Sequence, residues 1–148
     1  MSSLIMDMHH LHECLKIICD VESEILNSNI FSIFKRKNYE GNSHSLEVAC
    51  IKLVELHSSI DEHLGYSEGV DRVIGDAKNY IYSLMLSTAK LISINKELEA
   101  KANGGNYSMV SYNSDMNEFR YLQDQYCILG DRMNANYKLY AYEIASLK

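Results

Sequence analysis

The sequence predicts an all-α fold, an antiparallel up-down bundle of three long helices and one shorter helix. None of its 148 residues is proline, the residue that most often interrupts helices. Its apolar content of 47% is enough to form the core of one domain spanning residues 1–148. Apolar residues also recur at helical spacing through most of the chain. We expect helices at about 3–37, 45–64, 68–102 and 115–147.

The last of these segments has the clearest pattern. Its apolar residues follow one another at steps of three or four, which places them on one side of a helix. At 1.5 Å per residue, about 32 residues form a rod of roughly 48 Å, too long to be stable alone in water. The other helices must therefore cover this stripe: Met116, Phe119, Leu122, Tyr126, Leu129, Met133, Tyr137, Tyr140, Ile144 and Leu147.

The first half of the chain predicts two helices joined by a loop at 38–43, with Gly41 as its hinge. The first helix would end in the basic run 35–37, which complements the negative end of the helix dipole. Each helix has one polar residue on its apolar seam, Glu22 in the first and His57 in the second. Antiparallel packing could bring these two together as a buried polar layer, or His57 could be a hydrogen-bonded core histidine that fixes the register.

Glycines mark the next two joints. Gly65 and Gly69 favour a break between the second and third helices, with Ser67 as the N-cap, although one kinked helix over 45–102 is an alternative. The third helix has polar residues on its seam at Thr88 and Asn95, which we interpret as register-setting positions. The sequence Asn-Gly-Gly-Asn at 103–106 ends it, and a loop would continue to a cap at residue 114 or 115.

Charge and composition exclude several classes of protein. The net charge of −6 argues against a nucleic-acid binder, because phosphate contacts need clustered Lys and Arg. The uncharged helical run at 79–89 is about half a membrane span, and the N-terminus lacks the apolar region of a signal peptide. The four cysteines form no Cys-x-x-Cys motif, which favours reduced, buried thiols. We expect a soluble, cytoplasmic protein with no membrane or nucleic-acid partner.

Catalytic and metal-binding patterns are weak. His9 with Glu13, and His57 and His63 around Asp61, have ligand-like spacings. Helix-bundle di-iron proteins, however, use Glu-x-x-His motifs, and none occurs in this chain. No cysteine or serine lies beside a histidine in a glycine-rich turn, and no phosphate-binding loop is present. We therefore expect no enzyme, no cofactor and no metal site, and keep a metal-binding helical-bundle enzyme that uses the N-terminal histidines as an alternative.

One segment indicates a partner. Residues 39–66 contain five acidic residues against Lys52 alone, a net charge of −4 that accounts for most of the total. Such a face steers a basic partner into register. We predict a non-enzymatic protein-binding module, an acidic inhibitor of the immunity-protein or antitoxin type; the alternative is a structural or chaperone-like bundle that forms a homodimer. The predicted contact residues are Tyr39, Glu40, Glu47, Glu55, Asp61, Glu62 and Tyr66.

Overall fold

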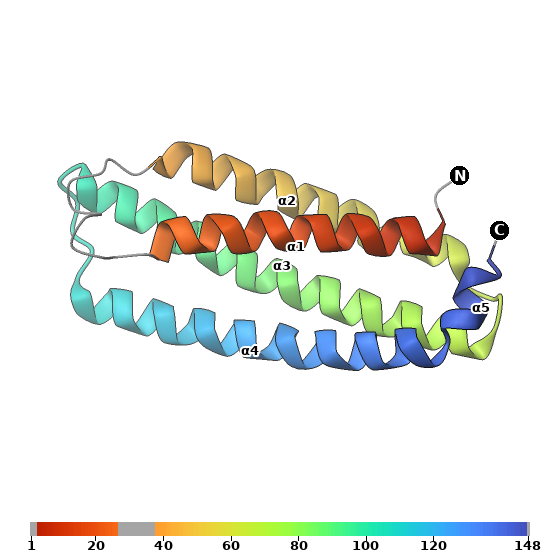
Figure 1. Ribbon diagram of the computed structural model, residues 1–148. Helices are drawn as coiled ribbons and strands as arrows, with labels where there is room; N and C mark the ends of the chain where they lie inside the picture. The colour runs from red at the N-terminus through yellow and green to blue at the C-terminus, as the bar shows by residue number, and fades with distance from the viewer. Residues whose placement is uncertain (1–2, 27–37, 148) are drawn as a thin grey trace.

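Figure 1 shows the computed structural model, which describes residues 3–26 and 38–147. The all-helical prediction is confirmed for these residues, which form helices and no strand. No helix among them is both long and apolar enough to cross a membrane. The part of the predicted first helix that follows α1, including the basic run 35–37, lies outside the described residues. The elements are α1 (Leu4–Leu26), α2 (Tyr39–Ser59), the 3-10 helix η2 (Ile60–His63), α3 (Glu68–Ala102), α4 (Met109–Leu139) and α5 (Ala141–Ala145).

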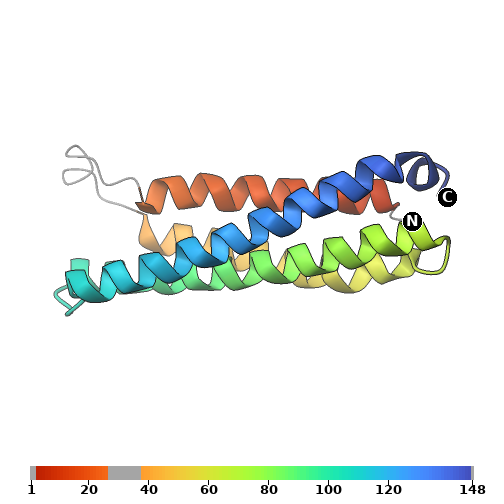
Figure 2. The same ribbon diagram turned by 90° about the horizontal axis from the view of Figure 1, so that it is seen from below.

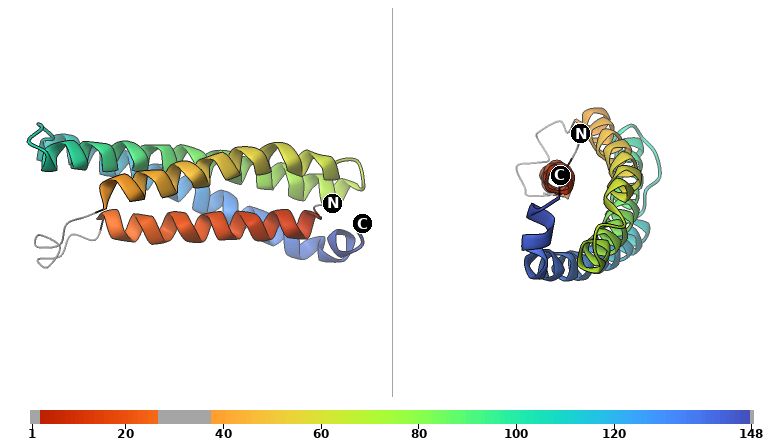
Figure 3. Two further views of the ribbon diagram at one scale, coloured as in Figure 1. Left: turned by 90° about the horizontal axis from the view of Figure 1, so that it is seen from above. Right: turned by 90° about the vertical axis from the view of Figure 1, so that its right-hand side faces the viewer.

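The central helix is α3, which packs against α2 on one side and α4 on the other. Seen end-on, α2, α3 and α4 form a curved layer, and α1 lies on its concave side (Figure 3). Helix α1 contacts mainly α2, whereas α4 forms the opposite edge of the layer (Figure 3) and runs obliquely to α3 (Figure 2). Both α2 and α4 are thus edge helices, and each has a side directed away from the core.

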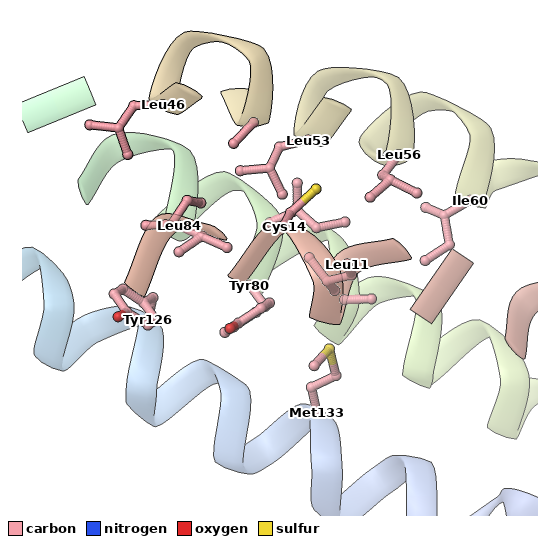
Figure 4. Close-up of a cluster of buried hydrophobic side chains, with 14 of the residues drawn as sticks. Leu11, Cys14, Leu46, Leu53, Leu56, Ile60, Tyr80, Leu84, Tyr126 and Met133 are labelled. Atoms are coloured by element: carbon pink, nitrogen blue, oxygen red, sulfur yellow. The ribbon is translucent and has the colours of Figure 1, made fainter. Parts of the chain in front are cut away.

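The core is formed by the apolar stripes that the sequence indicates. All ten positions of the final stripe are buried or half-buried. Figure 4 shows Leu53 of α2, Cys14 of α1 and Tyr80 of α3 in one continuous cluster. The Tyr80 and Tyr126 rings pack edge to face with their centroids 6.0 Å apart, joining α3 to α4.

The two polar residues on the α3 seam form hydrogen bonds inside the protein, but only those of Asn95 reach another helix, and among the described residues its side-chain oxygen has no partner. Thr88 donates its hydroxyl to the Leu84 carbonyl at 2.7 Å. The Asn95 amide donates to the Tyr39 carbonyl and to the Ser43 hydroxyl, both at 2.8 Å. Both side chains are fully buried, so the Asn95 contacts fix the start of α2 against the end of α3.

The predicted loop at 38–43 is wrong, because α2 begins at Tyr39 rather than at 45. Asn38 is the N-cap, and its side chain accepts the Gly41 amide at 3.0 Å. The next turn is held by Asn95 and buries Asn42. Capping and tertiary contacts therefore extend the helix through a sequence that is rich in loop-forming residues.

The break between α2 and α3 is confirmed. Helix α2 tightens into η2, and Gly65 follows with φ of +91°, a conformation that favours glycine. The Ser67 side chain accepts the Val70 amide at 3.1 Å and caps α3, as predicted. Gly69 packs directly against the Tyr140 ring, where a β-carbon would have no room.

The boundaries of the final helix differ from the prediction at both ends. Helix α4 begins at Met109 because Ser108, and not residue 114 or 115, accepts the amide of Ser111. Asp115 lies inside the helix, where it accepts hydrogen bonds from Tyr107 at 2.6 Å and from Lys90 at 3.0 Å. The helix ends at Leu139 rather than at 147, and the separate helix α5 then contacts α1, α3 and α4. Its residue Ile144 is almost fully buried, so the apolar pattern predicts burial correctly although the helix is interrupted.

Candidate functional site

The five predicted acidic residues lie on α2 and on η2, and all of them are exposed. Glu40, Glu47 and Glu55 project from α2, and Asp61 and Glu62 from η2. The α2 glutamates lie off the side of the helix that packs against α1 and α3, whereas Asp61 of η2 faces Lys78 of α3. The acidic segment of the sequence is therefore also an acidic surface of the fold.

Three of these charges are partly compensated by neighbouring lysines. Asp61 accepts both of its bonds from Lys78, at 2.8 and 2.9 Å. Glu47 lies 3.3 Å from Lys96, and Glu55 lies 4.0 Å from Lys52. The two Glu pairs are exposed to water, so they contribute little energy and a partner can displace them. Within the described residues, Glu40 and Glu62 form no ion pair.

The two predicted tyrosine anchors lie at opposite ends of this surface. Tyr39 is the first residue of α2 and is half-buried, whereas Tyr66 follows η2 and is exposed. A helix of 21 residues separates them, about 31 Å at 1.5 Å per residue. Binding energy concentrates near the centre of an interface, so two side chains this far apart are poor candidates for one anchor cluster.

A central anchor is nevertheless present, and sequence reasoning missed it. Val48, Ile51 and Val54 point outward from the middle of α2 and are 50%, 60% and 50% exposed. The core side of the same helix is formed by other residues, Leu46, Ala49, Leu53 and Leu56, all of them buried. Helix α2 is therefore apolar on two faces, and only one of them is covered. The sequence signal for this second apolar face was the spacing of three between residues 48, 51 and 54, which do not belong to the core seam.

A groove between α1 and α2 continues this apolar face. Its volume is about 330 Å³, and its apolar lining includes Ile17 of α1 together with Val48 and Ile51. Ile17 is also about half exposed. Polar side chains also line it: His10, Glu13, Ser45, Lys52 and Glu55. We call Ile17, Val48, Ile51 and Val54 the outer apolar patch; an exposed apolar cluster with a polar rim is typical of a protein-binding surface.

Two other hollows are less suited to a partner. A cavity of about 200 Å³ between α1 and α4 is lined by Met8, Leu15, Tyr80 and Met133, among others. It is smaller than typical small-molecule sites. A wider hollow of about 560 Å³ lies where α2 begins and α3 ends, and it is polar, with Glu40 and Glu47 on its wall.

The histidines do not form a metal centre in the described part of the chain. His9 lies 3.3 Å from Glu13 on the exposed side of α1. His63 lies 3.0 Å from Asp7, and this partly buried pair ties the start of α1 to η2. In residues 3–26 and 38–147, no three His, Cys, Asp or Glu side chains lie close enough together to hold a metal ion.

Glu22 and His57 do not form a buried polar layer between α1 and α2. Glu22 instead accepts a hydrogen bond from Gln123 of α4 at 2.8 Å. Burial raises the pKa of the Glu22 carboxyl, and the Gln123 hydrogen bond partly offsets that increase. His57 lies half-buried on α2. The Glu22–Gln123 contact thus connects α1 to α4.

The four cysteines are free, and only Cys14 is buried; Cys127 is exposed. Burial raises the pKa of all four thiols, including Cys127, where nearby aspartates add to the effect. Nucleophilic cysteines need the opposite shift, because the thiolate is the reactive form. The thiol environments therefore do not support cysteine catalysis.

Comparisons of the chain with protein-family models, with curated proteins and with solved structures give no match. A functional assignment therefore has to rest on the geometry of the surface itself.

Proposed function

We propose that this protein is a non-enzymatic protein-binding module, an acidic inhibitor that occludes a basic partner in the manner of immunity proteins and antitoxins. The observation that carries the proposal is the outer face of α2, where exposed acidic residues surround exposed aliphatic ones. Apolar side chains supply binding energy at the centre of such an interface. The surrounding carboxylates speed association and select a partner of positive charge.

The position of α2 supports this function. We propose that the four main helices form an antiparallel up-down bundle in one domain, in which α3 is central and α2 is an edge. A partner can then dock on α2 without disturbing the packing of α3 against α4. Four free cysteines fit a reducing compartment, so we place this activity in the cytoplasm.

Capture from a lysate of the source cells tests the proposal. The bait is the wild-type protein, a variant with Glu40, Glu47, Glu55 and Glu62 changed to Lys, or a matched control. The control reverses four exposed acids elsewhere: Glu24, Glu97, Asp124 and Asp131. We expect one basic protein to be retained near one-to-one at low salt by wild type and control, released at high salt, and absent from the α2 variant. Equal retention of that protein by the α2 variant would contradict the placement of the site.

A further inference from the structure

We propose that the outer apolar patch receives an amphipathic helix from a different protein, whose apolar stripe has Lys or Arg residues on both sides. This inference rests on the proposed function and names the chemistry of its partner. Three features of the described residues support it: the spacing of the apolar side chains, the arrangement of the surrounding acids, and the electrostatic cost of pairing with a second copy.

The spacing matches a helix. Val48, Ile51 and Val54 follow one another at steps of three along α2, which corresponds to about 4.5 Å per step along the axis. A partner helix presents side chains at steps of three and four with the same rise, so its stripe can interdigitate with this one. Ile17 lies across the α1–α2 groove and offers a second wall for the same stripe.

The acids lie on both sides of the patch along the helix axis. Glu47 and Glu55 adjoin the apolar residues, and Glu40 and Glu62 follow seven residues further out in each direction. Lys52, the one lysine on this stretch, pairs with Glu55, and Lys96 of α3 pairs with Glu47; both pairs are exposed, so a basic partner can displace them. A helix that crosses the patch therefore passes carboxylates before and after its apolar contacts, and basic residues at those positions are favoured.

The same arrangement disfavours a second copy of this chain. A two-fold antiparallel contact centred on Ile51 pairs Val48 with Val54, Glu47 with Glu55, and Glu40 with Glu62. A parallel contact places each of these glutamates opposite its own copy. Both geometries bring like charges together at the edges of the patch, which opposes self-association and favours a basic helix.

Fluorescence anisotropy with three synthetic 21-residue helical peptides tests this inference. The first peptide has a central leucine stripe with lysines on both sides. The second has glutamates in place of the lysines, and the third keeps the lysines but has glutamines in place of the leucines. Each is titrated with wild-type protein, with Ile51→Gln and with Ile128→Gln. The two isoleucines form a matched pair, because Ile128 on α4 is 57% exposed and Ile51 is 60% exposed.

We expect the first peptide to bind wild type and Ile128→Gln equally, and to bind Ile51→Gln at least tenfold more weakly. The other two peptides should bind wild type at least tenfold more weakly than the first. If the glutamine peptide binds as tightly as the first, the proposed apolar contact with a helix is wrong, but the proposal of a basic partner is still supported. Equal loss in Ile128→Gln would also overturn the placement. If neither lysine peptide binds at low salt, the proposed function fails as well.

Sedimentation velocity of wild type and Ile51→Gln tests whether a second copy of this chain occupies the outer apolar patch. We expect both to sediment as monomers at all concentrations. A wild-type dimer that disappears in Ile51→Gln would show that a second copy occupies the patch, which contradicts the inference.

Discussion

The two edge helices, α2 and α4, differ in how they expose apolar residues. On α4, Met109 and Val110 are exposed in the first turn, but the other exposed large apolar residues, Tyr121, Ile128 and Leu139, lie at least seven positions apart. On α2, three aliphatic residues are exposed within seven positions, and glutamates lie on both sides. Single exposed apolar residues are normal on any protein, whereas a cluster of them with a charged rim is typical of a protein-binding surface. Grouping, rather than the amount of exposed apolar surface, distinguishes the candidate site.

The largest expected effect separates the two apolar faces of α2. Leu53 is fully buried in the core, so Leu53→Ala should lower the free energy of unfolding by about 2–5 kcal/mol. Ile51→Ala, two positions away, should change it by no more than about 0.5 kcal/mol, because the side chain already contacts water. Urea denaturation of both variants measures the difference. Similar losses in the two would mean that Ile51 belongs to the core and the outer apolar patch does not exist.

A smaller loss is expected where α2 is fixed to α3. Asn95→Ala removes both donors that hold the Tyr39 carbonyl and Ser43, and it should cost about 1–3 kcal/mol of stability. The control is Asn117→Ala, at an exposed position on α4. Thermal denaturation followed by circular dichroism compares them. If the two variants melt together, Asn95 does not determine the start of α2.

The turn between α3 and α4 should show a pH-dependent effect of about 1 kcal/mol. The Tyr107 hydroxyl, followed by Lys90, lowers the pKa of the Asp115 carboxyl below its usual value. This stabilisation is present above the unfolded pKa, about 3.9, and is lost as the pH falls through the lower folded value. Tyr107→Phe should therefore be less stable than wild type at pH 7, and the difference should shrink in acid. The control is Tyr142→Phe, at a residue that is 87% exposed, and a pH-independent deficit in Tyr107→Phe would contradict this linkage.

The smallest expected effect concerns the distant tyrosine. Tyr66 is exposed and lies beyond η2, away from the outer apolar patch. Tyr66→Ala should change stability by no more than about 0.5 kcal/mol and should reduce affinity for the lysine–leucine peptide less than twofold. A loss as large as that of Ile51→Gln would show that the interface is centred near η2 instead.

Periodicity predicted the helices and most of the core because the spacing of Leu, Ile and Val indicates which side of a helix is buried. It failed at Asn38, Ser108 and Tyr140, where caps and contacts from distant residues decide the boundary. The acids of the candidate site could be found from charge alone. Its apolar centre could not be assigned, because only the fold shows which face of α2 remains uncovered.

The most direct test of the binding surface is a titration of ¹⁵N-labelled protein with the lysine–leucine peptide, followed by amide chemical shifts. We expect the largest shifts along 44–58 of α2 and around Ile17 of α1, with the amides around Ile128 unchanged. Shifts centred on α4, or spread evenly over the protein, would contradict the central claim that the outer face of α2 is the site of partner binding.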